Sequence, residues 1–305
     1  DKQAPPGPRA ARPELVLQTG VTAPAFKAIF SPDGRLLASM DFMAGSIKLW
    51  ELATWRELFV INLGARAGFT YAINSTFAFN SDGSSLFSVS AGTLKQWDTR
   101  TGRQLRATDL NQGEDFGLVY FSADARLLAT TTMTKSLLAV WDVSSGRKLY
   151  ELKFENNDLQ VLALSPDGRT LAINNESDSG GVVRDVLTLL DAASGRAIQT
   201  IKISEQKRTM TMGPYSEPHR AIRFSPDGRA VAVVSNDEKR DASQMLSGGQ
   251  IRNSDRTNKI RTWDISSGRE TISLDFGSQS AGTYDPSLYP EMRDGFAFSN
   301  DNRQC

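Results

Sequence analysis

The chain has 305 residues, of which 39% are hydrophobic and 23% charged, with 35 lysines and arginines against 35 aspartates and glutamates. A net charge of zero gives no overall field to attract nucleic acid or an anionic membrane surface, which argues against both as partners. The apolar runs are of strand length, well short of the roughly 20 residues that a membrane-spanning helix needs. The single cysteine, Cys305, cannot form a disulfide within the chain. The compartment therefore stays open: cytoplasmic, or exported after removal of a leader.

Residues 1–12, DKQAPPGPRAAR, are rich in proline and charge and predict a flexible N-terminal segment. From residue 13 onward one pattern recurs. Its first half reads FSPDGRLLAS from Phe30 and returns, with variations and a partial last copy, from Phe79, Phe121, Leu164, Phe224 and Phe298. Proline and glycine set turn geometry and aspartate bonds nearby backbone, so each S-P-D-G predicts a tight turn between two strands.

The second half of the pattern reads IKLWELATWREL from Ile47 and recurs from Leu94, Leu138, Leu187 and Ile260. Segments such as SSGR, which follow the W-D pairs, predict a second tight turn. The flanking segments are short, alternating and rich in Val, Ile, Leu and Phe, as strands are. Each unit is thus predicted to hold four short antiparallel strands, and such units at about 40-residue spacing indicate the blades of a β-propeller.

The predicted fold is all-β, with five complete blades and an incomplete sixth formed by the two termini, in one domain over residues 13–305. The blades are expected at about 24–62, 74–109, 114–153, 158–203 and 219–275, and the partial blade at 13–20 with 294–305. An incomplete blade would expose strand edges that invite pairing. Either the chain is a fragment whose remaining blades follow Cys305, or another chain or residues 276–294 complete the blade.

These motifs resemble the WD-repeat family, in particular its divergent bacterial members, over nearly all of residues 13–305. The resemblance implies that the third-strand tryptophans pack between blades, and it gives structural, non-catalytic roles to Trp50, Trp97, Trp141, Trp263, Asp98, Asp142, Asp191 and Asp264. The family's usual Gly–His pair is missing, and Gly20–Val21 stands there in the first unit. The buried His–Ser–Asp–Trp hydrogen-bond network of the family therefore cannot form, and we expect looser blades than in eukaryotic relatives.

Length variation is concentrated in the connections that the resemblance places on the face opposite the tight turns. These are residues 63–73, 175–183, 204–218, 236–258 and 276–294. Loops on a rigid scaffold commonly carry recognition, so this face is the predicted binding surface for a protein or peptide. Its candidate anchors are the aromatic and methionine side chains Met210, Met212, Tyr215, Tyr284 and Tyr289. The alternative is that these side chains pack the loops onto their own propeller.

No motif predicts catalysis, a metal or a cofactor. His219 is the only histidine, so a multi-histidine metal site cannot form, and no nucleophile-elbow motif accompanies it. Three functions remain open: a non-enzymatic interaction scaffold, a sensor or regulatory segment of a larger bacterial enzyme (a kinase or caspase-like peptidase), and a carbohydrate-active propeller enzyme. We expect the first, with no enzyme activity.

Overall fold

The computed structural model describes residues 25–41, 45–63, 76–110, 116–132, 137–154, 159–179, 182–207, 222–239 and 255–279. Across these residues there is no helix, and twenty strands form five four-stranded antiparallel sheets. Each sheet uses four strands that are consecutive in the chain and adjacent in space. The predicted all-β fold of five four-stranded blades is confirmed. The expected sixth blade, at 13–20 with 294–305, lies outside the described residues.

The blades are numbered here in chain order. Blade 1 holds β1 (Ala25–Phe30), β2 (Leu36–Asp41), β3 (Ser46–Glu51) and β4 (Arg56–Asn62). Blade 2 holds β5 (Thr76–Phe79), β6 (Ser85–Ser90), β7 (Thr93–Asp98) and β8 (Gln104–Asp109). Blade 3 holds β9 (Phe116–Phe121), β10 (Leu127–Thr132), β11 (Leu137–Asp142) and β12 (Arg147–Lys153). Blade 4 holds β13 (Leu159–Leu164), β14 (Thr170–Ser179), β15 (Val182–Asp191) and β16 (Ala197–Lys207). Blade 5 holds β17 (Ile222–Phe224), β18 (Ala230–Lys239), β19 (Asp255–Asp264) and β20 (Glu270–Gln279).

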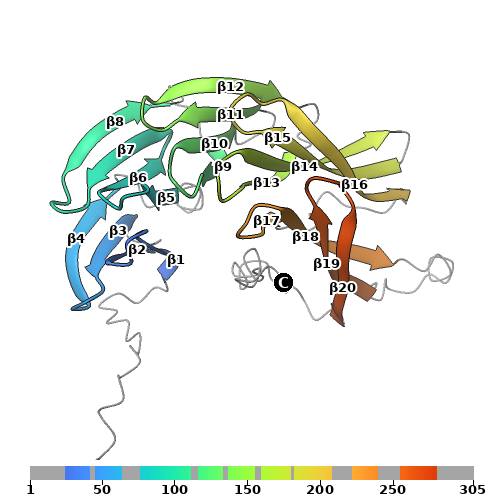
Figure 1. The fold of residues 1–305 in the computed structure, drawn as a ribbon, viewed down its shortest axis with the longest axis horizontal. Helices are drawn as coiled ribbons and strands as arrows, with labels where there is room; N and C mark the ends of the chain where they lie inside the picture. The colour runs from blue at the N-terminus through green and yellow to red at the C-terminus, as the bar shows by residue number, and fades with distance from the viewer. Residues whose placement is uncertain are drawn as a thin grey trace, which may run out of the picture.

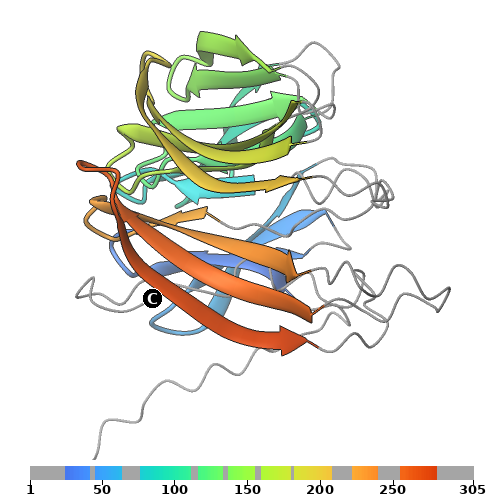
Figure 2. The same ribbon diagram turned by 90° about the vertical axis from the view of Figure 1, so that its right-hand side faces the viewer.

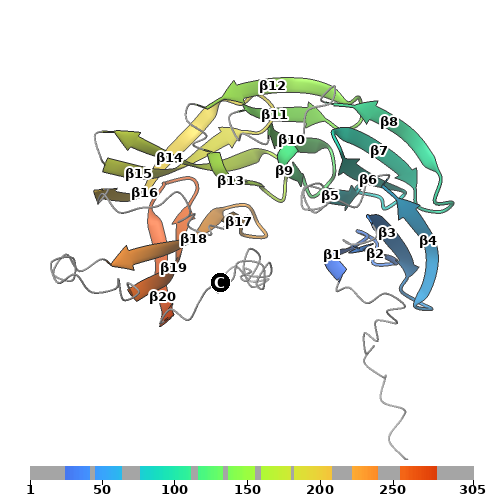
Figure 3. The same ribbon diagram turned by 180° about the vertical axis from the view of Figure 1, so that it is seen from behind.

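The five blades follow one another around an arc, as Figure 1 shows from one side and Figure 3 from behind. The first strand of each blade lies on the inside of the arc and the fourth on its rim. Blades 1 and 5 stand at the two ends. The arrangement is therefore propeller-like. In Figure 2, the turn between β17 and β18 and the turn between β19 and β20 lie together at the left edge.

The turn after each first strand is built on one serine and one aspartate. In blade 1, the Ser31 hydroxyl donates to Asp33 Oδ1 at 2.6 Å and accepts from the Leu36 N–H at 2.8 Å. The same serine–aspartate bond recurs in blades 3, 4 and 5, at Ser122, Ser165 and Ser225. In blade 2, Asn80 replaces the serine, and its Oδ1 accepts from the Ser85 N–H at 2.9 Å. The repeated letters S-P-D-G thus encode a self-contained hydrogen-bonded turn.

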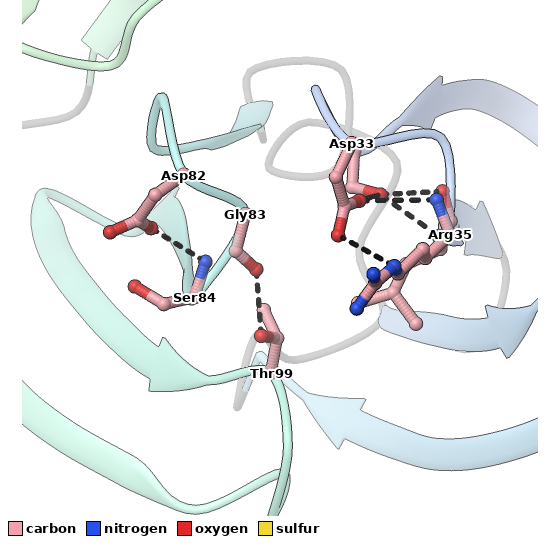
Figure 4. Close-up of polar contacts among 8 residues, drawn as sticks. Asp33, Arg35, Asp82, Gly83, Ser84 and Thr99 are labelled. Atoms are coloured by element: carbon pink, nitrogen blue, oxygen red, sulfur yellow. Dashed lines mark hydrogen bonds and ion pairs between the residues drawn. The ribbon is translucent and has the colours of Figure 1, made fainter.

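Figure 4 shows this turn in blades 1 and 2 side by side. Asp33 accepts from the Arg35 N–H, and Asp82 accepts from the Ser84 N–H at 2.8 Å. The Thr99 hydroxyl then ties the turn of blade 2 to its third strand by donating to the Gly83 carbonyl at 2.8 Å. A Cβ on Gly83 would lie 3.6 Å from Asp33 Oδ1, so the turns of neighbouring blades touch.

The turn after each third strand is organised by the aspartate of the W-D pair. In blade 5, Asp264 Oδ1 accepts from the Ser267 N–H at 2.8 Å and from the hydroxyls of Ser266 and Ser267 at 2.7 Å. These bonds favour the ionised carboxylate and lower the pKa of Asp264 from 3.8 to about 2. Blades 2, 3 and 4 repeat the arrangement, and hydrogen bonds likewise lower the pKa of Asp98, Asp142 and Asp191.

Apolar packing joins consecutive blades, with one buried cluster at each of the four junctions. Trp97 of blade 2 packs with blade 1, Trp141 of blade 3 with blade 2, and Trp263 of blade 5 with blade 4. The indole N–H of Trp97 donates to Ser88 Oγ, and that of Trp141 to Thr130 Oγ1, both at 2.9 Å. These hydrogen bonds between an indole N–H and a hydroxyl on the second strand therefore form in a chain that lacks the Gly–His pair.

A glycine four residues after each of these aspartates lets adjacent blades approach closely. Gly102, Gly146, Gly195 and Gly268 all have φ near +70°. A Cβ on Gly195 would lie 2.7 Å from the Tyr150 ring of the preceding blade, and one on Gly102 would lie 2.7 Å from the Phe59 ring. Both the backbone conformation and the contact exclude a side chain there. In blade 1 the corresponding residue is Trp55, with φ 53°.

Candidate binding site

The loop residues predicted to anchor a partner lie outside the described residues. This holds for Met210, Met212, Tyr215, Tyr284 and Tyr289, and also for His219 and Cys305. Their binding role therefore stays a prediction. The described residues offer two other candidate surfaces, both at the N-terminal end of the arc.

The first is the sheet face of blade 1 that points away from blade 2. Phe30 pairs with Leu37 and Leu37 with Trp50 across β1, β2 and β3, so their side chains share one face. Val60 on β4 pairs with Lys48 and lies on that same face. We call Phe30, Trp50 and Val60, together with Trp55 in the turn between β3 and β4, the blade 1 free face; at the glycines that correspond to Trp55, a Cβ would meet the preceding blade. In every later blade with a tryptophan, the corresponding face packs on the preceding blade.

This free face is unusually apolar for an exposed surface. Phe30 is 64% exposed, Val60 47% and Trp55 40%, and they make up half of the six large exposed hydrophobic side chains in the described residues. Phe79, which corresponds to Phe30 in blade 2, is only 3% exposed because blade 1 covers it. Monomeric proteins rarely leave contiguous apolar patches uncovered without a binding purpose.

Two residues of the free face differ from their counterparts in the other blades. Trp55 stands where the other four blades have glycine. Val60 stands where they have Ala107, Glu151, Thr200 and Ser273, at the same register position opposite the third strand. These two positions are therefore more apolar in blade 1 than in the other four blades.

The free face carries an ion pair beside its aromatic ring. The Lys48 ammonium lies 3.3 Å from a Glu57 carboxylate oxygen and 5.8 Å from the centre of the Trp50 ring. The Trp50 indole N–H donates to Ser39 Oγ at 2.9 Å, which leaves the ring available for apolar contact. This combination of aromatic anchors with a neutral polar border is typical of protein-binding surfaces.

The second surface is a pocket of about 300 Å³ on the inside of the arc. Its walls come from β1, β5 and β9, the inner strands of blades 1, 2 and 3. The lining is mainly apolar and aromatic, and Phe30 borders both this pocket and the blade 1 free face. The lining includes Lys27, Ile29, Phe77, Phe79, Tyr120 and Phe121.

Lys27 is the only charged side chain among the described residues that line this pocket. Its ammonium lies 5.2 Å from the centre of the Phe77 ring, within the range of a cation–π interaction. Burial, with a smaller contribution from the positive charge of Arg223 on β17, lowers the pKa of Lys27 from 10.5 to about 8. The pocket therefore combines an aromatic wall with a cation that is poorly solvated.

The aspartates of the turns are not suited to acid–base chemistry near neutral pH. The aspartates of the turns accept several short hydrogen bonds, which hold Asp98, Asp142 and Asp264 ionised, with lowered pKa values. No cluster of three or more His, Cys, Asp or Glu side chains suited to a metal occurs in the part of the chain that the structure describes. A search of the same residues for helices of membrane-spanning length and apolarity finds none.

The comparisons with known proteins connect this architecture to a sequence class. No protein-family model matches the chain. A WD repeat-containing protein, SL1-17 of Schistosoma mansoni, is 27% identical over 143 residues, which cover 47% of this chain and 40% of that protein. The chain is similar to WD-repeat proteins. Telomerase protein component 1 of Rattus norvegicus is 24% identical over 242 residues, 74% of this chain but 9% of that protein.

The WD-repeat similarity is distant, and the chain spans less than half the length of each of these two relatives. Among solved structures, Kuenenia stuttgartiensis hydrazine synthase superposes with a TM-score of 0.57 at 17% identity, over 86% of this chain and 69% of that one. At this identity the superposition supports the fold alone. The expected bacterial type and the fragment hypothesis stay predictions.

Sequence reasoning missed both surfaces in the described residues. Trp55 was a visible signal, because it breaks a glycine pattern that the other four repeats keep. The pocket had no such signal, since Lys27 and Phe77 come together only through the packing of β1 on β5.

Proposed function

We propose that the chain is a non-enzymatic interaction scaffold that binds a protein or peptide partner. The observation that carries this proposal is the blade 1 free face, where the apolar side chains of Phe30, Trp55 and Val60 are exposed. Trp and Phe are favoured anchors at protein interfaces, since they bury a large area with little loss of conformational entropy. The distant similarity to WD-repeat proteins supports the same role.

A second candidate is a sensor or regulatory segment within a larger protein. It is supported by the telomerase protein components of rat and mouse, in which the matched region makes up only 9% and 6% of the protein. Repeats similar to these thus occur as small parts of much longer chains. The kinase or caspase-like peptidase expected above would be the larger protein in that case. No observation on the described residues favours a carbohydrate-active enzyme.

The free face is tested by giving blade 1 the residues of other blades. Trp55→Gly with Val60→Thr removes two apolar anchors, and both replacements already occur at these positions elsewhere in the chain. The matched control is Leu105→Thr with Ile198→Thr, which changes exposed apolar residues on the rims of blades 2 and 4. Wild type and control are expected to retain the same partner from a native extract, and the blade 1 variant to lose it.

The predicted loop face is tested in the same experiment with a second variant. Tyr215→Ala with Tyr289→Ala removes two of its candidate anchors. Loss of the partner in this variant alone would move the interface from blade 1 to the loops, and retention in all variants would contradict both surfaces. Sedimentation of the wild type and the blade 1 variant shows whether the partner is a second copy of the chain.

A further inference from the structure

We infer that the pocket formed by β1, β5 and β9 is a site where a small aromatic aldehyde binds and forms a reversible imine with the Lys27 side chain. The pocket volume of about 300 Å³ is at the lower end of the range for small-molecule sites. That volume suits a single ring with a short side chain. The site uses other side chains than Trp50, Trp55 and Val60, and it does not depend on the proposed function.

The walls of the pocket select the ring of the ligand. Ile29 comes from β1, Phe77 and Phe79 come from β5, and Phe121 comes from β9. Phe77 and Phe79 are buried in the junction of blades 1 and 2, which holds their rings in place. Rings fixed in this way favour a flat apolar guest by offset or edge-to-face contact, with little ordering cost. We therefore expect the pocket to prefer an aromatic aldehyde to an aliphatic one of similar reactivity.

Lys27 places an amine beside this aromatic wall. Its Nζ lies 5.2 Å from the centre of the Phe77 ring, and the side chain both lines the pocket and is partly exposed. Among the described lining residues it is the only amine. An electrophilic carbonyl on a ring stacked near Phe77 is therefore brought to one nitrogen nucleophile, across a spacer of one or two carbons.

The protonation state of Lys27 suits this reaction, because a lysine attacks a carbonyl carbon only as the neutral amine. Burial, and to a smaller extent the charge of Arg223, lowers the pKa of Lys27 to about 8. About one-tenth of the Lys27 amine is then neutral at pH 7, against fewer than about one in 2,000 for an ordinary lysine of pKa about 10.4. A neutral amine that donates a hydrogen bond to a neighbour still keeps the lone pair with which it attacks.

The bond-forming step needs no further reactant. The Nζ lone pair adds to the aldehyde carbon, and one amine proton passes to the carbonyl oxygen, which gives a carbinolamine. The carbinolamine loses its hydroxyl together with the second amine proton as water, and a C=N bond joins the ligand to Lys27. Nothing is oxidised or reduced, and addition of water to the C=N bond releases the aldehyde again.

The test is reductive trapping of the full chain at pH 7 with 3-phenylpropanal or with butanal, which carry the same reactive group. Cyanoborohydride fixes each imine as a secondary amine, and mass spectrometry measures the label on Lys27 and on acetyl-lysine amide added as a reference amine. With 3-phenylpropanal, Lys27 should be labelled at least about tenfold faster than the reference, because far more of it is neutral. With butanal this excess should be smaller. Equal labelling of Lys27 and the reference by 3-phenylpropanal, or the same excess with both aldehydes, would overturn the inference.

The pH dependence assigns the reactivity to the lowered pKa of the Lys27 amine. The excess of Lys27 over the reference amine should be greatest below pH 8 and should disappear as the pH rises towards about 10.4, where the reference also becomes neutral. Among the described residues, Tyr120 in the lining and Arg223 on β17 are the other titratable or charged groups that bear on Lys27. An excess that stays constant from pH 7 to pH 10 would contradict this assignment.

A wall variant assigns the preference for a ring to the pocket. Phe121→Leu removes one ring and keeps an apolar side chain, so Lys27 should lose much of its preference for 3-phenylpropanal and keep its reaction with butanal. Circular dichroism and the unfolding transition verify that the variant is folded. If the folded variant keeps the full preference, the inference is wrong. The blade 1 variant with Trp55→Gly and Val60→Thr should be labelled like wild type, which separates this site from the proposed protein interface.

Discussion

Replacing Gly195 by alanine tests the close approach between blades 3 and 4. Two effects are expected to add. The first is backbone strain, because Gly195 has φ 71° and an alanine in the left-handed region costs about 1–2 kcal/mol. The second is a collision, because the new Cβ would lie 2.7 Å from two carbons of the Tyr150 ring. Overpacking of this kind costs about 1–3 kcal/mol.

Gly34 separates these two effects. It has φ 68°, but a Cβ there meets no atom within 4 Å, so Gly34→Ala carries the strain alone. Reduced freedom of the unfolded chain returns about 0.4–1 kcal/mol in both variants. The net loss of unfolding free energy is then about 1 kcal/mol for Gly34→Ala and about 2–4 kcal/mol for Gly195→Ala.

The assay is urea unfolding at pH 7, followed by circular dichroism and intrinsic fluorescence. Adding Tyr150→Leu removes the ring, so the cost of Gly195→Ala should fall to about 1 kcal/mol in that background. The reasoning is refuted if Gly34→Ala and Gly195→Ala cost the same, or if Tyr150→Leu leaves the cost of Gly195→Ala unchanged.

Three further predictions concern single side chains. Trp55→Gly should change the free energy of unfolding by less than about 1 kcal/mol, because relief of its positive φ offsets the lost burial, and chemical denaturation beside wild type measures this. Lys27→Met should stabilise the fold by about 2–3 kcal/mol at pH 7, because the pKa of Lys27 is lowered to about 8 and its charge therefore costs stability below that pH. Since the cost is relieved between pH 8 and 10.5, the advantage of the variant should shrink over that range. Among the described residues, Tyr120 in the pocket lining and Arg223 are the other titratable or charged groups that bear on Lys27. A constant advantage up to pH 10.5 would contradict the lowered pKa. Asp264→Asn should lower the midpoint of urea unfolding at pH 7. This difference from wild type should disappear as the pH falls from 3.8 through about 2, because the Asp264 carboxylate then becomes protonated in both the unfolded and the folded state. A deficit that persists below pH 2 would show that the charge is not what the turn requires.

Much of the fold could be predicted because its determinants are local. Ser31, Asp33 and Gly34 form a turn through bonds between residues at most five positions apart, and a repeated set of letters therefore predicts a repeated turn. The third-strand tryptophans repeat with the same regularity. Their hydrogen bonds to serine or threonine on the second strand are less visible, since Ser88 and Thr130 have no fixed neighbour in the sequence to mark them.

The pocket was harder to predict than the blade 1 free face because it arises between blades. The expectation of looser blades rested on a missing Gly–His pair, and it stays untested. The structure nevertheless shows how adjacent blades contact one another: the glycine turns at Gly102 and Gly195 lie against Phe59 and Tyr150 of the preceding blade. These contacts join residues more than forty positions apart, so no local pattern reveals them.

The exception at blade 1 links the fold to the proposed function. At each inner junction a glycine turn receives a side chain of the preceding blade, so both the contact and the backbone conformation disfavour a side chain there. Trp55 occupies that position at φ 53°, a conformation that costs a bulky residue about 1–2 kcal/mol and that glycine would adopt freely. Trp55 thus keeps a large apolar side chain at the surface, beside exposed Phe30 and Val60, in spite of this backbone cost. An exposed apolar side chain kept against a backbone cost is expected of a binding surface, which is the reason for placing the proposed interface on the blade 1 free face.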